Sequence, residues 1–146
     1  MTTKPILLVE DTPDDAELTV MSLKHSGVLN RVVVVEDGIE ALDYVFAQRK
    51  FLTRSPEDSP ALVLLDIKMP RLNGIEVLQR LRADSRTRLL PVVMLTTSTE
   101  EVDLVQAYES GANAYVRKPV NLAQFQEAVQ QLGLFWILTN EVPSGR

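Results

Sequence analysis

Five acidic, hydroxyl or amino side chains stand at the ends of short apolar runs in this sequence: Glu10, Asp11, Asp66, Thr96 and Lys118. Three carboxylates held close together repel one another, so either a cation lies among them or one of them takes up a proton. Carboxylate ligands without histidine or cysteine suit Mg²⁺ better than zinc. A lysine ammonium and a threonine hydroxyl bind phosphoryl oxygens. Together these residue types predict a Mg²⁺-assisted phosphoryl-binding site, provided that the fold brings them together.

Each of these residues on its own has an ordinary structural explanation. Asp66 could simply end a strand or cap the next helix, and Glu10-Asp11 could be an acidic turn. Thr96 could be an ordinary strand terminus, and Lys118 could be a solvated lysine. The prediction therefore depends on all of them reaching the same edge of one fold.

Apolar periodicity predicts the elements that would position them. Strands are expected over five short apolar or β-branched runs, at residues 6–9, 32–35, 61–65, 92–95 and 114–117. Helical spacing predicts helices at residues 14–27, 39–46, 75–81 and 100–110, with a last helix capped by Asn121. Residues 49–60 contain two prolines and no periodicity, which predicts a long surface loop.

Strands that alternate with helices predict an α/β fold with a doubly wound, five-stranded parallel sheet and helices on both faces. Parallel strands need crossover connections, and these place the helices over the sheet. The carboxyl ends of all strands then share one edge, where ligands bind in such folds. We therefore expect the five polar groups to converge there.

Composition limits the class of protein. The 146 residues, 45% of them hydrophobic and 24% charged, suit one domain with its own core. A net charge of −5 argues against binding nucleic acid, which requires a basic face. No apolar run approaches the ~20 residues of a membrane span and no signal-peptide layout is present, so we expect a cytoplasmic protein. The absence of cysteine and the single histidine, His25, argue against cysteine zinc sites and histidine-based triads.

The chain resembles the receiver domains of two-component response regulators from residue 5 to about residue 132. The motifs that carry the resemblance occur in the family's order: Glu10-Asp11, Asp66, Met69-Pro70, Gly74, Thr96 and Lys118-Pro119. The resemblance implies a receiver domain over residues 1–132 and a flavodoxin-like fold. The strand order 2-1-3-4-5 is taken from the chemotaxis receiver.

The resemblance also implies that Asp66 accepts a phosphoryl group from a histidine kinase. The chain would then be no enzyme beyond its own phosphorylation and dephosphorylation. Mg²⁺ would be bound by Asp11, Asp66 and the main-chain oxygen of Lys68, with Glu10 acting through water.

In the same family pattern, Thr96, Lys118 and the main-chain N–H of Thr97 would hold the phosphoryl oxygens. Movement of the Thr96 hydroxyl toward the phosphoryl group would let Tyr115 turn inward. The surface formed by the helix at 100–110, the strand at 114–117 and the last helix would then change shape and carry the signal.

The C-terminal part of the chain is unusually apolar. A helical stripe that ends at Leu132 is followed by Gly133 and by five apolar residues, among them Phe135 and Trp136. This is more apolar surface than a solvated terminus exposes. We expect residues 133–146 to form a dimerisation extension of a homodimer, with Leu132, Phe135 and Trp136 in the interface beside the signalling surface. The alternative is a tail that folds back onto its own domain.

The extension, the 49–60 segment and the acidic opening at 10–15 resemble the single-domain response regulators of bacterial and cyanobacterial phytochromes. This narrower resemblance implies that the phosphodonor is a phytochrome-type histidine kinase. We therefore expect no DNA-binding or catalytic output region, and the signal would leave by protein contact.

Three other functions fit parts of the pattern. A haloacid-dehalogenase-type phosphatase, which would hydrolyse an aspartyl phosphate with Mg²⁺, has a second Asp two residues after its nucleophile, where this chain has Lys68. A flavodoxin-like nucleotide binder would use residues 96–98 as a phosphate loop, yet the carboxylates would repel an anion unless a metal intervened. A receiver-shaped interaction module that is never phosphorylated would not need the complete acidic site.

Overall fold

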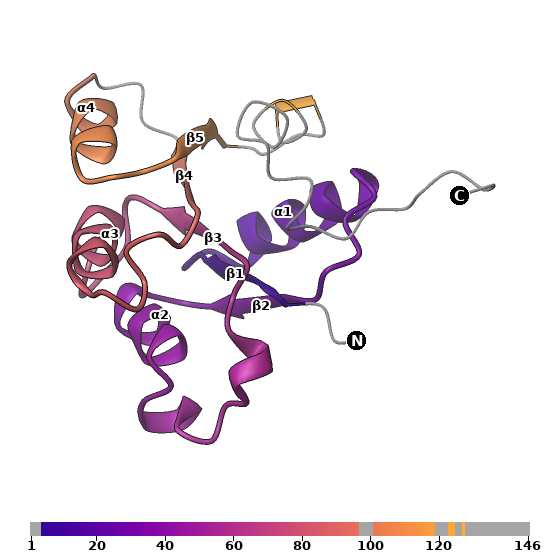
Figure 1. Ribbon diagram of the computed structural model, residues 1–146. Helices are drawn as coiled ribbons and strands as arrows, with labels where there is room; N and C mark the ends of the chain where they lie inside the picture. The colour runs from indigo at the N-terminus through magenta and orange to yellow at the C-terminus, as the bar shows by residue number, and fades with distance from the viewer. Residues whose placement is uncertain (1–3, 97–100, 119–122, 125–126, 128–146) are drawn as a thin grey trace.

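The computed structural model describes residues 4–96, 101–118, 123, 124 and 127. Within these residues five strands alternate with four helices and two short 3₁₀ helices (Figure 1). In chain order they are β1 (Ile6–Val9), α1 (Pro13–His25), β2 (Val32–Val35), α2 (Gly38–Val45), η1 (Arg49–Phe51), η2 (Pro56–Asp58), β3 (Leu62–Asp66), α3 (Gly74–Ala83), β4 (Val92–Thr96), α4 (Glu101–Glu109) and β5 (Ala114–Arg117). None of the described helices is long and apolar enough to cross a membrane.

The five strands form one parallel sheet in the order β2-β1-β3-β4-β5. Helix α1 covers one face, and α2 and α3 cover the other (Figure 1). The predicted fold class and strand order are therefore confirmed. In the register of the sheet, Val9 lies opposite Leu65 and Thr96 lies opposite Arg117. The ends of β1, β3, β4 and β5 consequently reach the same edge.

Two apolar layers hold the helices against the sheet. One joins Leu7, Leu65 and Met94 to residues of α2 and α3, and the other joins Leu8 and Leu64 to α1. Neighbouring residues of a strand point to opposite faces, so a strand that is covered on both sides must be apolar throughout. Strands β1 and β3 are buried along their whole length for this reason.

The helix boundaries differ slightly from the predicted ones. Helix α1 begins at Pro13, a favourable first position, and ends at His25, two residues before the expected end at Gly27. Gly27 has a φ of 82°, so it lies just beyond the helix as a left-handed stop signal. Helix α3 begins with a reciprocal cap between Asn73 and Glu76, which explains its sharp start after the β3–α3 loop.

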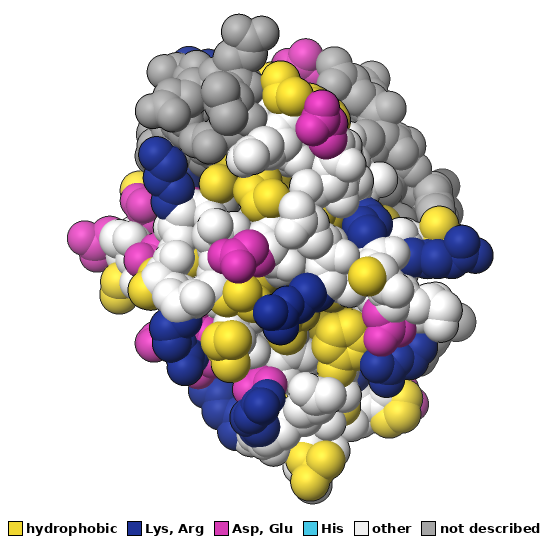
Figure 2. All heavy atoms as spheres, turned by 90° about the vertical axis from the view of Figure 1, so that its left-hand side faces the viewer, with side chains coloured by type: hydrophobic (Ala, Val, Ile, Leu, Met, Phe, Trp, Pro, Cys, Tyr) yellow, Lys and Arg dark blue, Asp and Glu magenta, His cyan; other side chains and the backbone are white. Residues whose placement is uncertain are grey.

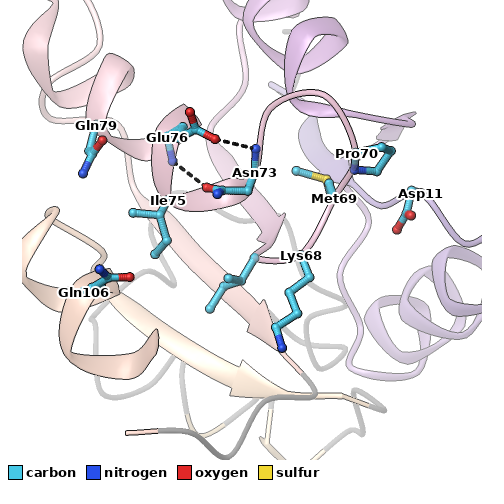
Figure 3. Close-up of a pocket in the computed structure, with 10 residues that line it drawn as sticks. Asp11, Lys68, Met69, Pro70, Asn73, Ile75, Glu76, Gln79 and Gln106 are labelled. Atoms are coloured by element: carbon cyan, nitrogen blue, oxygen red, sulfur yellow. Dashed lines mark hydrogen bonds between the residues drawn. The ribbon is translucent and has the colours of Figure 1, made fainter. Parts of the chain in front are cut away.

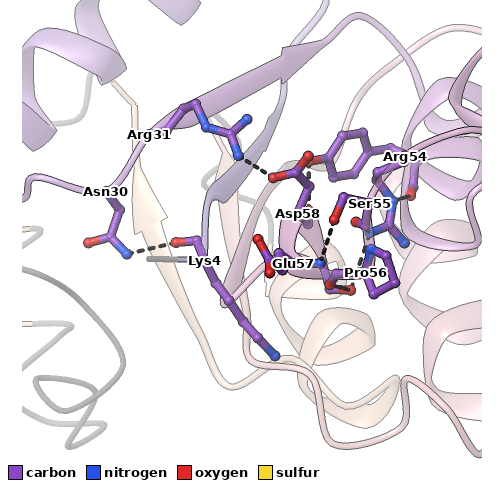
Figure 4. Close-up of polar contacts among 10 residues, drawn as sticks. Lys4, Asn30, Arg31, Arg54, Ser55, Pro56, Glu57 and Asp58 are labelled. Atoms are coloured by element: carbon purple, nitrogen blue, oxygen red, sulfur yellow. Dashed lines mark hydrogen bonds and ion pairs between the residues drawn. The ribbon is translucent and has the colours of Figure 1, made fainter. Parts of the chain in front are cut away.

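The 49–60 segment is more ordered than the predicted loop, because it contains both 3₁₀ helices. Arg54 donates hydrogen bonds to the main-chain oxygens of Tyr44 at 2.7 Å and Val45 at 3.1 Å, which are carbonyls at the end of α2. Arg31 forms an ion pair with Asp58 at 2.6 Å on the other side (Figure 4). The predicted surface connection is present, and only its two 3₁₀ helices were not predicted, because hydrogen bonds from an arginine to helix-end carbonyls leave no periodic signal in the sequence.

Candidate functional site

Two buried carboxylates lie at the carboxyl edge of the sheet. Glu10 directly follows β1 and is 2% exposed, and Asp66 is the last residue of β3 and is 6% exposed. Both positions are fixed by the all-apolar strands that precede them. Buried acids are rare unless they are paired or bind a metal, so these two carboxylates require a cation beside them.

Lys118, which directly follows β5, pairs with both carboxylates. Its Nζ donates to Glu10 Oε1 at 2.7 Å and to Asp66 Oδ2 at 3.1 Å. The lysine side chain is only 8% exposed, so these charge-assisted bonds lie away from solvent. Three residues separated by long stretches of sequence thus form one ion cluster, as the strand-end pattern predicted.

Asp15 is a fourth member of this cluster that the sequence pattern did not identify. Its Oδ2 lies 3.1 Å from Lys118 Nζ, and the Asp15 side chain is 38% exposed. Asp15 belongs to the first turn of α1 and not to a strand end. The start of α1 at Pro13, directly beyond the end of β1, was the available signal, because it brings the first turn of that helix to the same edge.

The electrostatics of the cluster follow from burial. Burial raises the pKa of Glu10 to about 7, and the charge of Asp66 adds to this effect, while the hydrogen bond from Lys118 opposes it. Burial alone lowers the pKa of Lys118, but its bonds to Glu10 and Asp66 outweigh burial and raise it above its usual range. Lys118 therefore stays charged at neutral pH. Glu10 populates both its protonated and its ionised form near pH 7.

Three carboxylates could together hold a metal ion. Glu10, Asp11 and Asp66 each offer an oxygen, and these oxygens lie within 4.8 Å of one another. Asp11 is exposed. The second oxygens of the two buried acids accept long hydrogen bonds, from Thr12 N to Glu10 Oε2 and from Lys68 N to Asp66 Oδ1, both at 3.3 Å. Oxygens of this kind fit a hard divalent cation such as Mg²⁺.

A shallow hollow of about 640 Å³ opens beside Asp11. Asp11 and Lys68 come to it from two different loops, and Asn73 and Glu76 line it at the start of α3 (Figure 3). Gln106 of α4 closes its far side. Of the three carboxylates, Asp11 thus lines a hollow that is bounded by α3 and α4.

Of the other predicted site and interface residues, some lie wholly or partly outside the described part of the chain. Thr96 ends β4 beside Arg117, at the expected edge, but its side chain lies outside the described part of the chain. Thr97, like the three predicted interface residues Leu132, Phe135 and Trp136, lies outside it entirely.

Tyr115, the predicted switch residue, is half-buried in β5. Its ring meets the ring of Tyr108 of α4 edge-on, with centroids 5.2 Å apart. Tyr108 is itself 52% exposed. This aromatic pair links β5 to α4, which are two of the elements expected to carry the signal.

The raised pKa of Glu10 leads to a pH prediction for metal binding. A cation competes with the proton on Glu10, so the apparent affinity for Mg²⁺ should increase about tenfold from about pH 6 to about pH 8 as the carboxyl ionises. Titration calorimetry at several pH values measures this directly. Glu10→Gln should flatten the profile, and a wild-type affinity that does not change with pH would contradict the assignment.

The outer face formed by α2, α3 and α4 shows mixed charge. Lys and Arg side chains alternate there with Asp, Glu and apolar side chains and do not gather into one basic area (Figure 2).

Comparisons with known proteins agree with the geometry. The family model for the response regulator receiver domain matches residues 6–130. The solved bacteriophytochrome response regulator RtBRR is 51% identical, with a TM-score of 0.86 over 99% of this chain and 86% of that one. AtBRR, another bacteriophytochrome response regulator, is also 51% identical, with a TM-score of 0.85 over 97% of this chain and 100% of that one.

The response regulator Rcp1 from Synechocystis sp. is 36% identical over 97% of this chain and 94% of its own length. A solved structure of the Mn²⁺-bound form of Rcp1 has a TM-score of 0.75 and 35% identity, and the match covers 97% of this chain and 99% of that one.

Proposed function

Because this chain belongs to the response regulator receiver domain family and is related to phytochrome response regulators, we propose that it accepts a phosphoryl group from a histidine kinase on Asp66. The observation that carries the proposal is the ion cluster, in which Lys118 binds both buried carboxylates while Asp11 stays exposed beside them. The chain is proposed to catalyse no reaction beyond its own phosphorylation and dephosphorylation.

The residues of the cluster have separate tasks in this reaction. An oxygen of the Asp66 carboxylate attacks phosphorus in line with the leaving group, forming an oxygen–phosphorus bond as the bond to the donor breaks. The Lys118 ammonium offsets the negative charge on the phosphoryl oxygens. Thr96 and the main-chain N–H of Thr97 are proposed to bind the same oxygens, as in the family pattern.

The cation site is proposed to take Mg²⁺. Asp11, Asp66 and the main-chain oxygen of Lys68 would hold it directly, and Glu10 would hold it through water. When bound, the cation supplies positive charge beside the transferred group. Receiver domains bind a divalent metal, and the Mn²⁺-bound form of Rcp1 supports this site.

Incubation with acetyl phosphate and Mg²⁺, followed by intact-mass measurement, tests this function. The wild-type protein is expected to gain the mass of one phosphoryl group, and Asp66→Asn is expected to gain none. Asp14→Asn, which changes an exposed acid in the first turn of α1, serves as the matched control and should keep the adduct. A wild-type protein without adduct, or an adduct that survives Asp66→Asn, would overturn the proposal.

A phytochrome-type histidine kinase is the proposed phosphodonor. The support is the 51% identity to two bacteriophytochrome response regulators over nearly the whole chain. Phosphotransfer from a purified bacteriophytochrome kinase should be faster than from an unrelated histidine kinase, which checks this pairing. A cytoplasmic location and the absence of nucleic-acid and membrane partners stay predictions.

The protein is also proposed to be a homodimer, formed through α4, β5, the last helix and residues 133–146. The support within the described residues is the apolar surface of α4, where Val105 is 45% exposed and Tyr108 is 52% exposed. The mass from light scattering should be that of a dimer for the full chain and of a monomer for a chain ending at residue 132. Equal monomer masses would refute the proposal.

A further inference from the structure

The loop between β3 and α3 directly follows Asp66 and carries Lys68 (Figure 3). Its base is closed by a hydrogen bond from Gly74 N to Ile67 O at 2.8 Å. Within the loop, Leu72 N donates to Pro70 O at 2.7 Å. The loop is thus compact, and its path determines where the main chain at Lys68 lies relative to the Asp66 carboxylate.

The tip of this loop is tied to the start of α2 by an ion pair. Both Nε and Nη2 of Arg71 donate to Asp37 Oδ2, with Nε at 3.1 Å. Arg71 has a φ of 66°, a left-handed conformation that residues with a side chain seldom adopt. A residue keeps such a conformation only when its surroundings fix it.

Asp37 is itself held rigidly. Its Oδ1 accepts a hydrogen bond from Glu40 N at 2.9 Å and so caps the start of α2, and its side chain is only 14% exposed. The neighbouring Gly38 lies against the same loop, because a Cβ at this position would be 2.3 Å from Leu72 O. The start of α2 therefore packs directly against the β3–α3 loop.

We propose that Asp37, acting through Arg71, is a positioning residue for the phosphorylation site. The pair holds the β3–α3 loop so that the main-chain oxygen of Lys68 stays available to the cation bound beside Asp66. This inference rests on the proposed function. Neither partner is among the proposed ligands of the cation or of the phosphoryl group, and the pair would act only through the path of the loop.

Two variants separate this role from simple capping of α2. Asp37→Asn keeps a good helix cap, since asparagine caps as well as aspartate, but removes the charge that holds Arg71. Arg71→Ala leaves the cap intact and removes the other partner. Each is expected to weaken Mg²⁺ binding about three- to fivefold, the factor that corresponds to a partly exposed ion pair. The double variant should be no worse than either single variant, because both remove the same contact.

Lys50→Ala is the matched control. It breaks an ion pair with Glu40 of the same helix, at 2.6 Å, that does not reach the loop. The Mg²⁺ affinity of this variant should equal that of the wild type. Arg71→Lys, which keeps the charge but not the two-pronged contact, should restore part of the affinity.

Amide hydrogen exchange in the metal-free protein gives a second readout. Arg71→Ala should speed exchange at Leu72 N and Gly74 N, whose hydrogen bonds close the loop, while Phe46 N at the end of α2 should stay protected. Faster exchange at all three amides would show general destabilisation and would overturn the proposal. Unchanged Mg²⁺ affinity in both single variants would also overturn it. If the wild type itself gains no phosphoryl group, the proposed function fails, whatever these variants show.

Discussion

Replacing Lys118 with methionine is expected to destabilise the protein by about 3 kcal/mol at about pH 8 and to slow phosphorylation by at least about a hundredfold. Methionine fills a similar volume, so the change removes the ammonium group and leaves little cavity. Glu10 and Asp66 then face each other without a cation. Removing one partner of a buried ion cluster is costly because the remaining charges keep their desolvation penalty.

The pH dependence of this loss has a definite sign. Without Lys118 the pKa of Glu10 should rise further above its already raised value of about 7, so the folded state holds a proton that the unfolded state releases. Stability from such a group is present at low pH and is lost as pH rises through the folded pKa. The methionine variant should therefore be closest to the wild type below about pH 6.

Urea unfolding at two pH values, with and without Mg²⁺, measures these effects. Added Mg²⁺ should recover part of the lost stability, because it binds the folded state and replaces the missing positive charge. Lys24→Met, at an exposed position of α1, is the control and should change stability by less than about 0.5 kcal/mol. A Lys118→Met protein as stable as the wild type at high pH would show that the ion cluster does not form.

Replacing Gly74 with alanine is expected to cost about 3 kcal/mol and to disturb the site as well. A Cβ at this position would lie 2.2 Å from Asp66 O and 2.9 Å from Ile67 Cα. The obstructing atoms belong to the backbone, so no change of rotamer relieves the contact. Either α3 or the end of β3 must move, and β3 ends at Asp66, the proposed phosphoacceptor.

Asn73→Ala is the reference variant with which the stability loss of Gly74→Ala is compared. It removes the cap of the same helix one residue earlier, which costs about 1 kcal/mol without forcing atoms together. The order of stability should be wild type, Asn73→Ala and then Gly74→Ala, with only the glycine variant losing Mg²⁺ affinity as well. Equal losses in the two variants would mean that the helix start matters only through its cap.

The sheet was predictable because its signal is local. Each strand is a short apolar run, and the residue after the run marks the carboxyl edge, so the residue pattern alone brings Glu10, Asp66 and Lys118 together. Asp15 was not predicted as a member of the ion cluster, because it reaches this edge of the sheet from a helix and not from a strand end. The Asp37–Arg71 ion pair was not predicted either. It depends on a left-handed backbone at Arg71, and an arginine gives no sequence signal for that conformation.

The Lys118–Glu10 bond joins residues 108 positions apart in the chain. A ribosome must therefore have released nearly the whole domain, and β1 and β5 must both have joined the sheet, before Asp66 has its ammonium partner. Fragments and partly assembled chains lack this partner and should not be chargeable by the phosphodonor. Under the proposed function, phosphate uptake would therefore require the completely folded domain, because only that state carries the whole ion cluster.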